Sequence, residues 1–473
     1  MSAGVFDAPR AGFSKPALNH SRDLRRYSPI VSAPGMNTGA YHEKDAPKGR
    51  ESKIYLNIGE EVSDEINNIL KSYTAPPKVV INNGFDGGRN LEVLVKYLGD
   101  PGSYGVVSGR KPSGPCHFGH KLVVETLSFF QENGGWIFLP VADLEVILDP
   151  KIDKEEHYFL LAADNLLDWG AWGLNLDAAY VYPQSEEIRV MNLAYLLSRN
   201  LNFENYLDIY GADTMINEFQ FIFAGLTQVG DILLPQHSEF GKETSFMLSG
   251  PDQDGHMKMT TDLSGYAVES GIIKSLPSSL YIPLIPSFEG KKESSSGPGA
   301  TLYLGSLRNE YAFLENGGKQ LDNIRKLSLD ERIKESMYKI DKYCEINKPG
   351  VESSICKRAE FLDCFSDLDL ADDNLITTFK ARVASNLKDQ YERRKQVLEY
   401  ALYLTGEYLE KKGELAKKEE LKTVAMTKKL NLYNSSIPAF WKKESASYIP
   451  ENLRTAQTPW YLLVSRAIAQ LQP

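Results

Sequence analysis

The chain has 473 residues, of which 42% are hydrophobic and 25% charged, and its formal net charge is −10. This length suggests about three domains, and the composition supplies ample material for apolar cores. The acidic balance argues against a protein that coats nucleic acid with its whole surface, although it does not exclude a local basic face. No stretch approaches the roughly eighteen apolar residues of a membrane span, so we expect no membrane partner.

Residues 1–75 are expected to form an N-terminal extension that is partly irregular. Residues 1–52 are rich in Ser, Pro, Gly, Asn and charge, and they show little periodicity. An organelle transit peptide is the alternative for this segment; Asp7 and Asp23 among its basic residues make a flexible extension the better interpretation. From residue 53 to residue 73 the pattern predicts a short strand followed by an amphipathic helix.

The four cysteines carry no C-x-x-C pairing. We expect no secretory leader, and reduced thiols in the cytosol are then the expected state. The sequence therefore predicts a cytoplasmic protein.

Apolar runs of strand length alternate with helical stretches across residues 76–326. Helical periods occur at residues 122–132 and 155–172. Continuous apolar strands that alternate with helices predict an α/β domain with a mainly parallel sheet covered on both faces. Ligands of such a sheet lie beyond the carboxyl ends of its strands. The strand-like runs are residues 78–83, 104–108, 136–142, 178–183 and 245–250.

From about Leu327 onward the pattern changes, and long helical periods with Lys, Arg and Glu dominate, for example over residues 372–412. We therefore expect residues 327–473 to form a separate α-helical domain. Basic side chains in this region are candidates for RNA contacts, although interleaved acids make a solvated helix face the alternative. The candidates are Lys380, Arg382, Lys388, Arg393, Arg394, Lys395, Lys411, Lys412, Lys417 and Lys418.

Residues 105–121, GVVSGRKPSGPCHFGHK, read as an apolar strand, a Gly/Pro/Ser loop and the start of a helix. His117 and His120 are three apart, which places two imidazoles on one face of the first turn. Gly119 leaves room for a ligand, and the free N–H groups of the turn attract phosphate. The alternative is a chance match in which both histidines do structural work.

Two further segments carry polar clusters next to strands. Residues 249–264, SGPDQDGHMKMTTDLS, follow a strand and lead into a helix, and simple helix capping by an Asp is the alternative there. Residues 290–304, GKKESSSGPGATLYL, bring lysines and serines before a strand. Lys291 or Lys292 could supply a cation to a polyphosphate, while a flexible polar loop is the alternative.

In this order the three segments resemble the motifs of class I aminoacyl-tRNA synthetases, specifically the tryptophanyl type of archaea and eukaryotes. SGRKPSGPCHFGHK resembles the "HIGH" element, and GPDQDGHMKMTTDLS resembles the GxDQDPHxRxTRD segment. KESSSGPGATLYL lies in register with KMSSSKPxSAIxL, the "KMSKS" loop, and YAFLENGGKQLDN resembles the segment that follows it. The resemblance covers roughly residues 104–325.

The resemblance implies a Rossmann-type catalytic domain at residues 76–326 and an anticodon-binding domain at residues 327–473. It implies activation of L-tryptophan by ATP with Mg²⁺, transfer to tRNA(Trp), a homodimer, and no DNA partner. It implies no metal held by a dedicated set of protein ligands. By position, the implied catalytic residues are His117, His120, Lys292, Ser294, Ser295 and Ser296. The implied ATP-binding residues are Gly109, Pro112, Ser113, Gly119, Gly250 and Asp252, and the implied amino-acid-binding residues are Glu145, Gln228 and Gln253.

The chain departs from the family pattern at several positions. Glu293 stands where the mobile loop has Met, which places a negative charge beside Lys292 and predicts a weaker attraction for triphosphate. Val107 replaces a tyrosine that helps to recognise the indole, Pro140 replaces a glutamine and Gly255 a proline. Three alternatives therefore stay open: a tyrosyl-tRNA synthetase, a paralogue that acts on an acceptor other than tRNA, and a non-catalytic RNA-binding protein.

Overall fold

The computed structural model describes ten stretches of the chain, all within one compact unit that spans residues 47–473. Most of the predicted N-terminal extension, including the short strand expected after residue 53, lies outside the described residues, as do Ser294, Ser295 and Ser296. The described stretches are residues 59–148, 155–210, 221–293, 301–303, 312–313, 324–325, 328–427, 430–441, 453 and 458–470.

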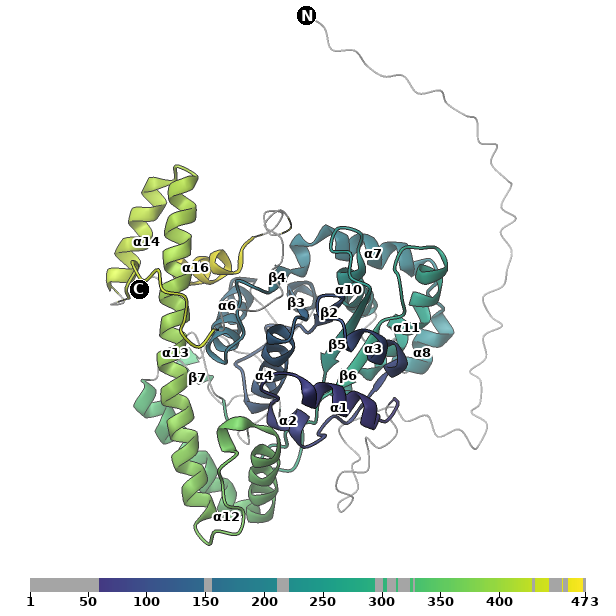
Figure 1. Cartoon of the computed structure of the whole chain (residues 1–473). Coiled ribbons are helices and arrows are strands. Elements are labelled where there is room, and N and C mark those ends of the chain that lie inside the picture. Colours follow the sequence, from purple (N-terminus) through teal and green to yellow (C-terminus); the bar gives the residue numbers. More distant parts are fainter. Residues whose placement is uncertain are drawn as a thin grey trace, which may run out of the picture. The chain divides into compact units, whose positions relative to one another are not determined.

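A six-stranded sheet with the order β1-β6-β5-β2-β3-β4 runs through the centre of the unit (Figure 1). The five strands from β6 to β4 are parallel, and β1 pairs antiparallel with β6 at one edge. The predicted mainly parallel sheet is thus confirmed. The strands are β1 (Gly87–Arg89), β2 (Tyr104–Val107), β3 (Trp136–Val141), β4 (Tyr180–Pro183), β5 (Thr244–Ser249) and β6 (Ser278–Tyr281).

The strand predicted at residues 78–83 is wrong, because Lys78–Ile81 form the short helix α2. Pro77 precedes this helix with φ −71°, and its carbonyl accepts the N–H of Val80. A proline pre-sets the first turn of a helix, and the buried valines contribute to the core equally well from a helix. Strands β1 and β6 escaped prediction because GGR and SSLY contain no continuous apolar run.

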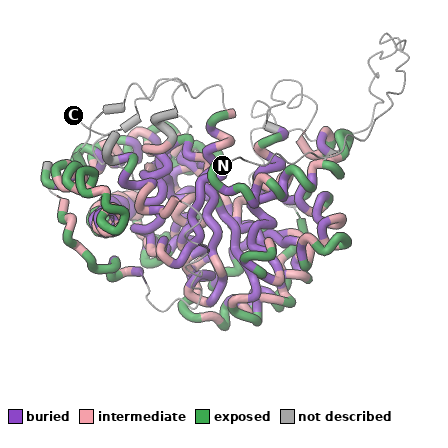
Figure 2. The backbone as a smooth tube through the Cα atoms, turned by 90° about the horizontal axis from the view of Figure 1, so that it is seen from above, coloured by how far each residue is buried: buried purple, intermediate pink, exposed green. Residues whose placement is uncertain are grey.

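Helices cover both faces of the sheet, and alternate residues of each strand point to different cores. Val106 and Leu139 join a core that includes α3 (Leu91–Leu98), α4 (Phe118–Glu132) and α6 (Glu155–Ala171). Val107 and Phe138 face a second core that includes Val190 of α7 (Ile188–Ser198). On that side α7 also packs with α8 (Phe203–Tyr210), α10 (Phe221–Leu233) and α11 (Asp254–Glu269) around a further apolar cluster. Figure 2 shows the buried strands between helices whose outer faces are exposed.

The C-terminal part of the described chain is helical, and the helix predicted over residues 372–412 is confirmed as α13. Its packing is continuous with the sheet domain, since Val397 and Trp441 belong to the same apolar core as β2 and α4. The Trp441 indole N–H donates to the Gly170 carbonyl at 2.8 Å. The boundary at residue 326/327 stays a prediction. The helices are α12 (Leu329–Phe361), α13 (Leu375–Lys411), α14 (Leu415–Thr427) and α16 (Trp460–Gln470).

The strand order changes direction between β2 and β5. From β2 the chain builds β3 and β4 on one side, and it later returns to build β5 and β6 on the other. At such a switch point the loops that leave the carboxyl ends of two neighbouring strands diverge and leave room for a ligand. The remaining short elements include α1 (Asp64–Ser72), which confirms the helix predicted before residue 73, α5 (Asp143–Ile147), and the strands β7 (Ala312–Phe313) and β8 (Ile324–Arg325).

Among the described helices we find none with both the length and the apolar character that crossing a bilayer requires.

Candidate active site

The HFGH turn begins α4 beyond the carboxyl end of β2, and the side chains of both histidines lie against its backbone. The backbone N–H of His117 donates to His120 Nδ1 at 3.2 Å, and the N atom of Gly119 lies 3.2 Å from His117 Nδ1. The two rings stack with their centroids 3.7 Å apart. Burial lowers the pKa of both histidines below the ordinary value. His120 therefore accepts at Nδ1 and keeps its single proton on Nε2, where it can be donated to a ligand.

The second segment forms the junction between β5 and α11. The strand ends at Ser249, Gly250 precedes a single 3₁₀ turn formed by Pro251–Gln253, and α11 begins at Asp254 without a side-chain cap from Gln253. The Asp254 carboxylate accepts hydrogen bonds from Tyr281 Oη and Arg89 Nη2, both at 2.8 Å. Asp254 thus anchors the junction to β1 and β6, which leaves the two preceding polar side chains for other partners.

Those side chains join residues that the sequence placed in two other segments. Lys292 Nζ lies 2.6 Å from Asp252 Oδ2, and Gln253 Nε2 donates to the same oxygen at 3.0 Å. Gln228 Nε2 of α10 donates in turn to Gln253 Oε1 at 3.5 Å. Although burial favours the neutral acid, Lys292 and Gln253 hold the pKa of Asp252 below its ordinary value. Four of the predicted site residues are therefore brought together.

Glu293 does not neutralise Lys292, contrary to what the sequence suggested. Its carboxylate is fully buried beside the HFGH turn, 3.3 Å from His117 Nδ1, and it pairs with Arg358 of α12. Consecutive side chains of an extended segment point to opposite sides, so Lys292 and Glu293 serve different partners. The role of Arg358 was missed, because a lone arginine in a long helical pattern carries no local signal of such a partner.

The remaining predicted residues lie around the same edge of the sheet. The Glu145 side chain of α5 is 38% exposed, and its Oε1 lies 3.7 Å from Lys111 Nζ, so the two side chains form a salt bridge. Ser113 is exposed. A side chain at Gly109 would collide with Pro140, and one at Gly250 would collide with Leu284 and Asp252. Contacts within the protein therefore explain why glycine is needed at both positions, without any contact to a ligand.

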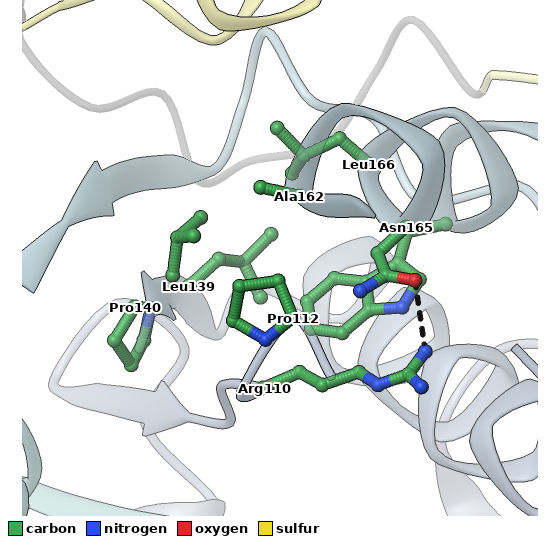
Figure 3. Close-up of a pocket in the computed structure, with 9 residues that line it drawn as sticks. Arg110, Pro112, Leu139, Pro140, Ala162, Asn165 and Leu166 are labelled. Carbon is green, nitrogen blue, oxygen red and sulfur yellow. Dashed lines mark hydrogen bonds between the residues drawn. The ribbon is translucent and has the colours of Figure 1, made fainter. Parts of the chain in front are cut away.

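A small pocket lies between the loop after β2, the end of β3 and α6 (Figure 3). Its wall is mostly apolar, and Arg110 Nη1 donates to Asn165 Oδ1 at 2.9 Å at its polar end. Pro140 lines this pocket, whereas Val107 and Glu145 do not. Its lining residues are Arg110, Pro112, Leu139, Pro140, Val141, Ala162, Asn165, Leu166 and Trp169.

Asp231, three residues after Gln228 on α10, is a buried carboxyl group that the sequence analysis did not single out. Tyr182 Oη donates to its Oδ1 at 2.9 Å, and Gln184 Nε2 donates to its Oδ2 at 2.6 Å. Burial outweighs these hydrogen bonds and raises the pKa of Asp231 to about 7. A clue was available in the GLTQVGD segment, which places Asp231 one helical turn after Gln228.

We expect Asp231 to lower the stability of the fold as the pH rises. Its pKa is raised from 3.8 to about 7, so the native state binds the proton more tightly than the unfolded chain. The resulting stabilisation is complete below the unfolded pKa and is lost as the pH rises through about 7. Melting temperatures of wild type and Asp231→Asn should be compared between pH 5 and pH 8.5. The melting temperature of the variant should rise relative to that of wild type as the pH increases. A difference that stays constant with pH would contradict this assignment.

The family model described as tRNA synthetases class I (W and Y) matches residues 101–373, more than half of the chain. The tryptophan–tRNA ligase of Methanocaldococcus jannaschii is 35% identical over 223 residues, 46% of this chain and 59% of that protein. The tryptophan–tRNA ligase of Aeropyrum pernix is 30% identical over 256 residues, 53% of this chain and 67% of that protein. The chain thus spans somewhat over half of the first of these relatives.

Solved structures show the same fold. The tryptophanyl-tRNA synthetase of Aeropyrum pernix superposes with a TM-score of 0.51 at 23% identity, covering 70% of this chain and 89% of that chain. The enzyme of Encephalitozoon cuniculi, solved bound to tryptophan, superposes with a TM-score of 0.51 at 16% identity, covering 71% and 90%. The Rossmann-like fold with a helical C-terminal region is thereby confirmed. The family match over residues 101–373 shows that this chain belongs to the class I tRNA synthetases of the tryptophan and tyrosine family.

Proposed function

We propose that the chain activates L-tryptophan with ATP and transfers the aminoacyl group to tRNA(Trp). The observation that carries this proposal is the meeting of Lys292, Asp252 and Gln253 beyond the carboxyl end of β5, the strand next to β2 and its HFGH turn. The expected reaction needs positioning of the carboxylate and ATP, and neutralisation of charge at phosphorus and on the leaving pyrophosphate. A mobile lysine and two imidazoles are suited to that work.

Each group has a defined part in this proposal. His120 donates from Nε2 to a phosphate oxygen, and Lys292 leaves Asp252 for the pyrophosphate when ATP is bound. Gln253 and Gln228 offer amide oxygens to the substrate ammonium, with Glu145 as a further acceptor after it leaves Lys111. Ser294, Ser295 and Ser296 are proposed to follow Lys292 onto the phosphates.

Mg²⁺ would share the neutralisation of phosphate charge. This ion prefers phosphate oxygens and water to a cage made only of protein ligands. In the described part of the chain no group of three or more His, Cys, Asp or Glu side chains is placed to hold a metal ion. We propose that the ion arrives with ATP, close to Asp252, which pairs with the lysine that would meet the phosphates.

Val107 and Pro140 differ from the residues that the family pattern carries at two recognition positions. The choice of tryptophan as the amino acid therefore rests on the named relatives. Both residues contribute only apolar surface, and Val107 is buried against Phe138 and Tyr180. An indole is largely apolar with one N–H donor, so its pocket needs little more than shape and a single acceptor. The buried pairing of Glu293 removes the main argument for a non-catalytic protein.

ATP–pyrophosphate exchange by the purified protein tests this function. We expect exchange that depends on tryptophan, followed by charging of tRNA(Trp) in the presence of the tRNA. Exchange driven by tyrosine would reassign the amino acid, and exchange without tRNA charging would favour another acceptor. No exchange with either amino acid would contradict the proposal.

The helical C-terminal region is proposed to contact the tRNA, and the protein is proposed to work as a cytoplasmic homodimer. The helices α7 and α10 pack together on the edge of the sheet domain (Figure 1) and expose Tyr195 and Phe223 at 69% and 53%. Exposed aromatic side chains on neighbouring helices support burial against a second copy. Reduced cysteines, with no disulfide among the four, agree with a cytoplasmic location.

A further inference from the structure

Glu293 connects three parts of the chain that lie far apart in sequence. One carboxylate oxygen, Oε1, accepts a hydrogen bond from Arg358 Nη2 on α12. The other, Oε2, lies 3.3 Å from both the Gly119 N atom and His117 Nδ1. The Glu293 and Arg358 side chains are 1% and 0% exposed. A buried carboxylate with both oxygens engaged is held in a single position.

Arg358 is built into the fold as the counter-ion. Its Nη1 donates to the carbonyls of Ser354 and Pro286 at 3.1 and 3.3 Å, and its guanidinium lies between the rings of Phe118 and Phe288 at 5.3 and 5.5 Å. The pair carries no net charge. Glu293 can therefore lie beside a site for triphosphate without the repulsion that an unpaired carboxylate would exert.

The carboxylate also decides where the His117 proton lies. A carboxylate only accepts hydrogen bonds, so an imidazole nitrogen that faces it at close range must carry a proton. Gly119 N–H then donates to Glu293, the stronger acceptor, and His117 donates from Nδ1. Of the other groups beside His117 in the described residues, Arg110 and Lys292 are cations, and His120 and Tyr303 are its neighbours. Glu293 is thus the group that favours a second proton, on Nε2, when phosphate oxygens approach that nitrogen.

We propose that Glu293 is a positioning residue for the activation step, which holds His117 in one orientation and supports its cationic form, with Arg358 as its counter-ion. This inference rests on the proposed function. It assigns a part in adenylate formation to α12, a helix of the C-terminal region. The methionine that the family pattern carries at position 293 offers no such acceptor.

A double-mutant cycle separates positioning from simple structural support. Glu293→Met and Arg358→Met each leave one buried charge unpaired, so each should lower the melting temperature by roughly 5 °C or more. The double variant Glu293→Met/Arg358→Met removes both charges and should recover most of that loss. Its kcat for ATP–pyrophosphate exchange should nevertheless stay about 10- to 100-fold below wild type, with little change in KM for tryptophan.

Two further variants keep this test decisive. Arg189→Met breaks another buried pair, with Glu187 at 2.7 Å, and should lower the melting temperature without changing kcat. Glu293→Gln keeps the shape but removes the charge, and it should lower kcat about 10-fold or more even if the double variant fails to fold. If the double variant or Glu293→Gln has the wild-type kcat, the inference about Glu293 is wrong, while the proposed function still stands. A wild-type protein without exchange would remove the proposed function itself.

Discussion

Replacing Lys292 by alanine is expected to slow adenylate formation by roughly 10²-fold or more, which is the usual cost of losing one charge contact made in the transition state. The Lys292 ammonium is 47% exposed and rests 2.6 Å from Asp252, so it is held near the site while it remains free to move. Its charge is needed most when pyrophosphate leaves. We therefore expect the loss mainly in kcat, as measured by single-turnover formation of the adenylate.

Lys291 provides the matched control for this experiment. It is the adjacent residue, has the same charge, and is 80% exposed with Glu289 at 3.8 Å. Lys291→Ala should react at nearly the wild-type rate, because the Lys291 ammonium is paired with Glu289, whereas that of Lys292 is paired with Asp252. If Lys291→Ala is slow and Lys292→Ala reacts at nearly the wild-type rate, the catalytic charge belongs to Lys291. If neither variant is impaired, the lysine mechanism is wrong.

The parts of the site that the sequence predicted are those that local patterns encode. The sequence named the HFGH turn, Asp252, Gln253 and Lys292 because each stands at a strand end or in a short motif. In a parallel sheet, strand ends meet along one edge, so local placement was sufficient to expect their proximity. The structure confirms that Asp252, Gln253 and Lys292 meet, whereas the serines after Glu293 lie outside the described residues.

The partners that the sequence did not reveal are long-range ones. Glu293 and Arg358 are 65 residues apart, and Arg394 reaches Asp164 across 230 residues. Neither pairing produces a pattern in the sequence, because each forms where a whole helix packs onto the sheet domain. The prediction for Glu293 failed for the same reason: proximity to Lys292 along the chain was visible, and the direction of its side chain was not.

The second large effect is expected for Arg394. The sequence predicts the same role for Arg393 and Arg394, but in the structure Arg393 is partly exposed and Arg394 is buried. Arg394 is 4% exposed, and its guanidinium contacts Asp164 and Asp168 of α6, with Nη2 2.6 Å from Asp164 Oδ1. Its assignment as an RNA contact is therefore wrong. Burial raises the pKa of Asp164 to about 6 even though Arg394 opposes that shift. Without Arg394, these two buried carboxylates would lose a cation that contacts both of them, although Arg332 and the Gln390 amide would remain nearby.

Arg394→Met should therefore lower the free energy of unfolding by about 3–5 kcal/mol, measured by urea denaturation, because breaking one side of a buried ion pair leaves uncompensated charge. Arg393→Met is the control: Arg393 is 37% exposed and pairs with Asp389 on its own helix, a contact worth under about 1 kcal/mol. Adding Asp164→Asn and Asp168→Asn to Arg394→Met should restore part of the loss. Equal effects of the two arginine variants would contradict this account.

The loss of stability should also reach the active site. Arg394 joins α13 to α6, and Asn165 of α6 accepts a hydrogen bond from Arg110 in the loop before the HFGH turn. On warming, Arg394→Met should therefore lose adenylate formation at a lower temperature than Arg393→Met.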